Sequence, residues 1–338
     1  MRSVIAITLC LIAGTAIACK VPVFRFALER WETDDYTLLY RDLTDAPQLG
    51  QQNVVARHDP DLLQKFAAFY PEAVGKDEPF WTGEDSSELM DSPLRQQLLE
   101  KITTGASTVW VLIEGPDQEQ NDAAQLKLTT LLAEAASTLE IPEGVVRPEQ
   151  LDTGEVNLAD IDVKNVLRSP IPLKIDFQSL RLKFGDQREA AFRQMLIGLS
   201  PNPAINDSQE PLLVPVFGRG RMLEALPASM LNQQTATMAS QYLCGECSCE
   251  VKDENPGADI LLTANWEEIL EDSYTIIDQT LPPLAGAGEF LSEPPAPAPM
   301  LKQESSEPSN LPRNLFILGV CAALFLSIAS TRILRPKA

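Results

Sequence analysis

The sequence predicts an α/β protein with a layered mixed sheet, flanking helices and a C-terminal transmembrane helix. Short apolar runs alternate with segments of helical periodicity along the middle of the chain. Two uncharged apolar runs lie towards the ends, over 4–18 and 315–331, and a proline-rich stretch precedes the second. These features divide the chain into a signal peptide (1–18), an N-terminal α/β region (19–144), a C-terminal α/β region with a cysteine cluster (145–281), a proline-rich disordered linker (282–312), a transmembrane helix (313–332) and a cytoplasmic tail (333–338).

The first apolar run has the form of an export signal. Arg2 precedes it, and it ends in Ala16-Ile17-Ala18, a small-residue pattern at which signal peptides are cleaved. Cleavage there makes Cys19 the first residue of the mature chain. Because a cysteine in this position is also typical of bacterial lipoproteins, lipidation of Cys19 is an open alternative.

The second apolar run has 17 residues, which is the short limit for a membrane span. Arg332, Arg335 and Lys337 follow it, and the positive-inside rule places such residues in the cytoplasm. The linker before the run holds eight prolines and is expected to act as a semi-extended tether. The sequence therefore predicts a single-pass protein of the bacterial cell membrane, with the bulk of the chain in the periplasm.

The chain is strongly acidic, with 48 Asp and Glu against 27 Lys and Arg and a formal net charge of −21. Several of the basic residues lie in the signal or beside the span, so the exported part is more negative still. A field of this sign repels nucleic acid. The sequence therefore predicts no nucleic-acid partner, and it favours a protein partner.

Capping residues and apolar periodicity predict the elements of the N-terminal region. Asp59-Pro60 and Ser92-Pro93 each place a capping residue before a first-turn proline, which is typical of a helix start. Strands are predicted over 21–26, 36–41 and 108–114, and helices over 62–69, 94–102 and 128–139.

The C-terminal region begins with a polar, irregular segment and then alternates again. Pro215 lies inside an apolar strand pattern and, because it lacks an N–H group, predicts an edge strand or a bulge there. The predicted elements are a loop over 145–172, a strand or hairpin over 173–184, a helix over 188–198, a strand over 212–217, a helix over 231–243, a turn over 255–257 and a strand over 259–264.

The order of strand, helix and strand, followed by Pro211 before L-L-V-P-V-F and a glycine turn, resembles a thioredoxin-like domain over residues 108–243. The resemblance implies a degenerate member, because Gln118 to Asp122 stands where that family keeps its C-x-x-C. Two further motifs, F-G-R-G-R and C-S-C-E-V-K-D-E-N-P-G, resemble those of a group of exported, membrane-anchored bacterial proteins of Planctomycetes type. This second resemblance implies no activity.

The cysteines outside the predicted signal and span are Cys19, Cys244, Cys247 and Cys249. In an oxidising compartment, closely spaced thiols favour disulfides. Gly245 allows a sharp turn, so we predict a Cys244–Cys247 bridge, with Cys249 either free or joined to Cys19. Two alternatives remain open, a zinc or iron–sulfur site on these thiols and a redox-active or partner-linked thiol.

The stretch F-G-R-G-R is a candidate anion-binding turn. Gly218 and Gly220 would let the backbone approach a ligand, and Arg219 and Arg221 offer forked donors for a carboxylate or phosphate. In so acidic a chain, the other interpretation is that these arginines pair with the protein's own carboxylates.

No motif in the chain assembles a catalytic constellation. The only histidine, His58, precedes a turn and has no nucleophile motif to serve. The sequence therefore favours a membrane-tethered extracytoplasmic binding or scaffold protein without a cofactor over an enzyme. The alternative is an extracytoplasmic thiol-redox or metal-handling protein that uses the C-G-E-C-S-C cluster.

Overall fold

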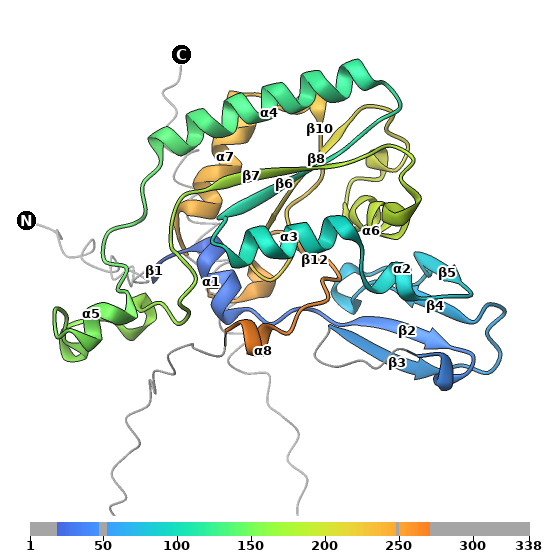
Figure 1. The fold of residues 1–338 in the computed structure, drawn as a ribbon, viewed down its shortest axis with the longest axis horizontal. Coiled ribbons are helices and arrows are strands. Elements are labelled where there is room, and N and C mark those ends of the chain that lie inside the picture. The colour runs from blue at the N-terminus through green and yellow to red at the C-terminus, as the bar shows by residue number, and fades with distance from the viewer. Residues whose placement is uncertain (1–18, 47–52, 248–249, 271–338) are drawn as a thin grey trace, which may run out of the picture. The chain divides into compact units, whose positions relative to one another are not determined.

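A computed structural model describes residues 19–46, 53–247 and 250–270, all within one compact unit (Figure 1). It is a mixed α/β fold, as predicted, with helices packed on mixed sheets. None of the helices in these ranges is both long enough and apolar enough to cross a membrane. The predicted signal peptide, linker and transmembrane helix lie outside the described residues.

The larger sheet has six strands and joins the two halves of the chain. Its order is β12-β9-β8-β6-β7, with β10 also pairing with β8. The central strand β6 runs parallel to β7 and antiparallel to β8, so strands from before and after residue 145 share one sheet. The strands are β6 (Thr108–Ile113), β7 (Phe177–Leu182), β8 (Leu212–Phe217), β9 (Arg221–Met222), β10 (Leu226–Pro227) and β12 (Ala258–Asp259).

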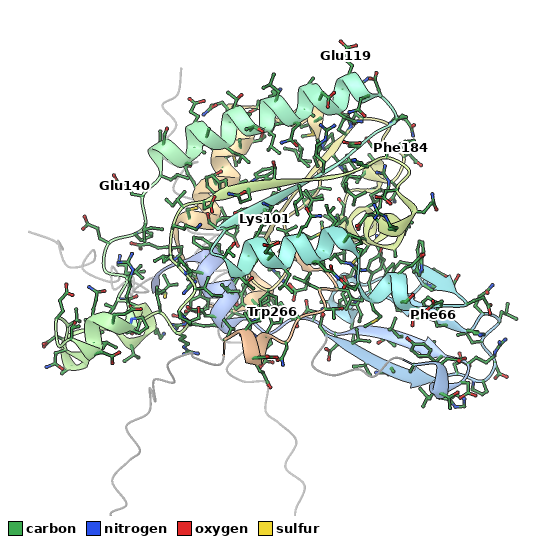
Figure 2. The ribbon with its side chains drawn as sticks, in the orientation of Figure 1. Phe66, Lys101, Glu119, Glu140, Phe184 and Trp266 are labelled. Carbon is green, nitrogen blue, oxygen red and sulfur yellow. The ribbon has the colours of Figure 1, made fainter. Side chains whose placement is uncertain are left out.

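Helices cover both faces of this sheet (Figure 1). All six residues of β6 are buried, and their side chains alternate between two cores. Trp110 and Leu112 pack under α4 (Gln118–Thr138) and α7 (Gln233–Cys244). Val109 and Val111 pack with α3 (Pro93–Thr103) and α6 (Ala190–Leu199) on the other face. Figure 2 shows Glu119 at the start of α4, Glu140 just after the end of this helix and Lys101 on α3.

The predicted helices over 94–102, 128–139, 188–198 and 231–243 correspond to α3, α4, α6 and α7. Ser92 caps α3, because its hydroxyl accepts a hydrogen bond from the Arg95 N–H. Helix α4 begins earlier than predicted, since Asp117 accepts from the N–H groups of Glu119 and Gln120. The segment predicted as a loop over 145–172 is mostly irregular and holds the short α5 (Pro148–Asp152).

A second sheet, ordered β3-β2-β4-β5, shows that the helix predicted over 62–69 is wrong. Asp59 caps only a turn, with its side chain accepting from the Asp61 N–H, and Leu63 is fully open to solvent. Phe66 begins a strand that pairs antiparallel with β2, and Figure 2 shows it within this sheet. Cross-strand pairing has overridden the local helix signal. The strands are β2 (Tyr36–Tyr40), β3 (Val54–His58), β4 (Phe66–Phe69) and β5 (Trp81–Gly83), and α2 (Ser87–Met90) follows them.

Pro215 does not place β8 at the edge of its sheet, so the edge alternative was wrong, whereas the register of β8 shifts by one residue between β9 and β10, as in the predicted bulge. The strand pairs with β6 on one side and with both β9 and β10 on the other. Pro215 falls in the gap between β9 and β10, where its carbonyl accepts from the Leu223 N–H. On this side of β8, no residue of β9 or β10 is paired with Pro215, so its missing N–H costs no hydrogen bond between strands.

The segment predicted as a strand over 21–26 changes structure after Pro22. Strand β1 (Cys19–Pro22) pairs with β11 (Glu246–Cys247), and α1 (Val23–Arg30) follows at once. Arg25 and Glu29, one turn apart on α1, form a fully buried ion pair with 2.8 Å between Nε and Oε1. The Glu29 carboxylate also accepts from the backbone N–H groups of Arg168 and Ser169. This pair therefore fixes the irregular segment against the helix.

The end of the described chain is less regular than predicted. The strand expected over 259–264 is reduced to the two residues of β12. The residues after it, Ile260 to Leu262, are buried in the core that α3 and α6 share with the smaller sheet, and α8 (Trp266–Ile269) closes the described part.

Candidate functional site

The glycines of F-G-R-G-R form a tight turn between β8 and β9. Gly218 has a φ of +57° and Gly220 a φ of +99°. A Cβ atom on Gly218 would lie 2.7 Å from the Cβ of Ala27, and one on Gly220 would lie 3.1 Å from Ile260. These glycines therefore bring the turn close to α1 and to the core.

Arg219 faces the protein and caps the C-terminal end of α1. Its Nε donates to the Leu28 carbonyl at 2.8 Å, and its Nη2 donates to the Glu29 carbonyl at 3.3 Å. Burial lowers the pKa of Arg219, and the neighbouring carboxylate of Glu32 opposes this shift. A cation at the end of a helix is stabilised by the carbonyls that have no partner within the helix.

Arg221 is 5% exposed and forms the centre of a buried ionic cluster. Its guanidinium donates to the carbonyls of Asn255 and Pro256 and to the Asp259 carboxylate, 3.1 Å away. Asp259 also contacts the ammonium group of Lys252 at 2.6 Å. Lys252 in turn contacts the Asp34 carboxylate at 2.6 Å. We call Asp34, Arg221, Lys252 and Asp259 the ionic hub.

The hub brings together the two motifs that the sequence singled out. F-G-R-G-R supplies Arg221, and the V-K-D-E-N-P-G stretch supplies Lys252 and the carbonyls that Arg221 holds. The donors of both arginines are directed at the protein's own oxygens. This geometry favours the interpretation that the arginines pair with the protein's own groups. The alternative, an anion-binding site, stays an untested prediction.

A cavity of about 460 Å³ lies beside the hub. Its charged groups include Glu224 and Asp253, which are exposed, and Lys76, whose ammonium group donates to the Gly198 carbonyl. Its lining is more apolar than polar and comes from five separate segments of the chain. We call it the β9–β12 cavity, and its apolar walls are Ala73, Val74, Leu199, Pro201, Met222, Leu223, Pro256 and Ala258.

Sequence reasoning missed this cavity. Residues 73–76 and 199–201 carry no motif, and only the fold brings them beside β9 and β12. The one signal was N-P-G: Gly257 has a φ of +110°, and a Cβ there would lie 2.4 Å from the Met222 carbonyl oxygen. A glycine in that position lets the cavity wall approach β9 closely.

The described cysteines lie in a single apolar cluster with α1 and the end of α7. Cys244 is the last residue of α7, and burial raises the pKa of its thiol to about 12, although a hydrogen bond with Ser107 opposes the shift. The Cys19 thiol donates to the Lys164 carbonyl at 3.1 Å, and burial raises its pKa as well. Cys247 lies opposite Cys19 in the β1–β11 pair. Cys249 lies outside the described residues.

Cys244, like Cys19, is a thiol in this structure, and the Cys244–Cys247 bridge stays an untested prediction. Across the described ranges, no group of three Cys, His, Asp or Glu side chains is arranged to hold a metal ion. His58 lies on β3, with its Nε2 3.1 Å from the Arg41 carbonyl oxygen and its side chain exposed.

We expect Cys244 to resist alkylation in the folded protein. The thiolate is the reactive form, and a pKa of about 12 leaves roughly one thiol in 10⁴ ionised at pH 8. N-ethylmaleimide should therefore label native Cys244 about 10³-fold more slowly than the unfolded chain, as measured by mass spectrometry after mild reduction. A Ser137→Cys variant on the exposed face of α4 provides the control. Equal labelling of the two positions would contradict the prediction.

Comparison with known proteins identified no relative: no protein-family model matches the chain, and neither the curated proteins nor the solved structures gave a match.

Proposed function

We propose that this protein is an extracytoplasmic binding module, tethered to the membrane by its C-terminal apolar segment, and that the β9–β12 cavity receives its partner. The cavity is the observation that carries the proposal. Its volume of about 460 Å³ is in the range of ligand pockets, and apolar walls with a few charged groups are typical of them. It can accept a small ligand or one or two side chains of a partner protein.

The ionic hub supports this proposal because it makes the cavity wall rigid. Arg221 holds the carbonyls of Asn255 and Pro256, and the next two residues, Gly257 and Ala258, also line the cavity. A wall fixed before binding costs less conformational entropy when a ligand arrives. Two members of the hub, Asp34 and Arg221, also line the cavity, so the hub both supports the site and forms part of its wall.

Thiol-redox or metal chemistry is less well supported. Catalytic and metal-binding cysteines act as thiolates, which require a lowered pKa. Burial has the opposite effect on Cys19 and Cys244. These thiols are better suited to packing than to exchange with a substrate.

We further propose that residues 108–243 form a degenerate thioredoxin-like domain. The strand order β9-β8-β6-β7, with β6 parallel to β7 and antiparallel to β8, supports this assignment. So does the packing of α4 and α7 together on one face. The turn between β6 and α4, where that family carries its dithiol, contains Gly115 and the capping residue Asp117. On this assignment the fold has kept its scaffold and lost its redox site.

Photo-crosslinking in intact cells tests the binding proposal. A benzophenone amino acid replaces Leu223, which lines the cavity, in the full-length protein. We expect a discrete crosslinked product, identified by its mass, which is lost when Ala73→Trp fills the cavity from its exposed rim. The control places the same probe at Leu126, which is 71% exposed on α4. The proposal is wrong if both probes give the same products, or if Ala73→Trp leaves the Leu223 product unchanged.

A further inference from the structure

We propose that Cys19 and Cys247 form a disulfide bond in the exported protein, which joins its first strand to the segment that follows α7. This pairing differs from both bridges that the sequence suggested. It requires only that the domain fold in an oxidising compartment, and it is independent of whether the β9–β12 cavity binds a partner.

The β1–β11 pairing supplies the geometry. Cys19 is the antiparallel partner of Cys247, and the register shifts only after it, between Cys19 and Pro22. Residues directly opposite one another in an antiparallel pair have their side chains on the same face, with Cα atoms about 4.5–5.5 Å apart. Disulfides need Cα atoms about 4.4–6.8 Å apart, so either kind of antiparallel pair suffices.

The surroundings of both residues favour the bond. Cys19 is 2% exposed and Cys247 is 0% exposed, and both belong to the cluster that contains Val21, Phe217 and Leu243. A disulfide is apolar, so it fits this environment without leaving a buried polar group. Each sulfur would give up a weak S–H donor, and the contact of Cys19 with the Lys164 carbonyl at 3.1 Å would be lost.

The same position of Cys19 disfavours its lipidation. A lipid-modified sulfur must reach the bilayer, whereas this one is enclosed by β11 and the segment around Lys164. One sulfur cannot carry both a thioether and a disulfide. The two modifications therefore exclude each other, and burial of Cys19 favours the disulfide.

The oxidant would be the disulfide of an exported thiol oxidase. One thiolate of this chain attacks that disulfide and forms a mixed disulfide, and the second thiolate then displaces the enzyme's sulfur. The two thiols lose two electrons and two protons in total, and the enzyme is released as a dithiol. Because burial raises the pKa of Cys19, this exchange takes place during folding, before β1 and β11 close over the sulfurs.

Peptide mapping of the full-length membrane-bound protein tests the proposal. Free thiols are blocked with N-ethylmaleimide, and the unreduced protein is cleaved after glutamate. Cleavage after Glu29, Glu246 and Glu250 separates Cys19, Cys244 and the Cys247–Cys249 pair into three different peptides. We expect a peptide that ends at Glu29 to be linked to Cys247–Glu250, with Cys244 alkylated after unfolding.

Two variants identify the sulfur that forms the link. Cys249→Ser should keep the linked peptide, and Cys247→Ser should lose it. Reduction should lower the melting temperature of the wild-type protein by about 5–15 °C and leave that of Cys247→Ser unchanged, since the bridge closes a very long loop. Both outcomes are independent of the crosslinking product at Leu223.

Four results would overturn the proposal. The first is a lipid mass on Cys19, and the second is alkylation of both Cys19 and Cys247 without reduction. The third is a link from Cys19 to Cys244. The fourth is a link that survives in Cys247→Ser and disappears in Cys249→Ser, which would assign the bridge to Cys249.

Discussion

Replacing Asp259 with asparagine is expected to lower the free energy of unfolding by about 3–5 kcal/mol. The change keeps the size of the side chain and removes its charge. Asp259 neutralises Arg221 and Lys252 in the buried hub and also accepts from the Asp34 N–H at 2.9 Å. Arg221, whose side chain is 6% exposed, would be left without an opposite charge. Denaturant unfolding of the purified protein measures the loss.

Asp253→Asn is the matched control. Asp253 lies in the same segment, also lines the cavity and is exposed to solvent. Its substitution should change the free energy of unfolding by less than about 0.5 kcal/mol. If Asp259→Asn is no more destabilising than Asp253→Asn, the hub does not support the cavity wall.

Glu29→Gln is expected to have an effect of similar size, about 3–5 kcal/mol, for a different structural reason. Glu29 compensates the buried charge of Arg25 and also accepts from two backbone N–H groups of the irregular segment. Burial already lowers the pKa of Arg25, and the carboxylate of Glu29 opposes that shift. A neutral side chain would therefore leave a desolvated guanidinium at the base of α1. Thermal and denaturant unfolding both report the loss.

A surface ion pair provides the comparison for this second variant. Lys20 and Glu246 lie 2.6 Å apart between β1 and β11, but their side chains are 37% and 39% exposed. Glu246→Gln should cost at most about 1 kcal/mol, because solvent screens the pair. If the Glu29 and Glu246 variants lose equal stability, burial would not be the reason for the effect at Glu29.

The sequence predicted elements best where a local signal and burial agree. Ser92-Pro93 starts α3 because the cap and the apolar face act together, and β6 is recognisable because all six of its residues are buried. Asp59-Pro60 has the same local signal, yet no helix forms there. Phe66 instead pairs with Tyr40 across the smaller sheet. A partner strand more than twenty residues away in sequence cannot be found from a capping pattern.

The candidate site, too, could be predicted from the sequence only in part. Its charges were anticipated in part, because an acidic chain suggests that Arg219 and Arg221 pair internally. The sequence did not identify the partners of these arginines: Arg219 donates to carbonyls of α1, and Arg221 donates to Asp259. The cavity depends on five segments that become neighbours only when the domain folds. No spacing in the sequence encodes that proximity.

The N-terminal segment of the domain has a consequence for the order of folding. Its partners come from the other end of the described chain: β1 pairs with β11, and the Tyr36 hydroxyl donates to the Asp259 carbonyl, 223 residues away. A chain emerging from its N-terminus must therefore keep the apolar face of α1 uncovered until almost all of the domain has appeared. Contacts of this separation form late and slowly. Helix α1, the first helix of the described residues, is thus among the last to be buried, and until then its apolar face is the surface on which aggregation or a chaperone would act.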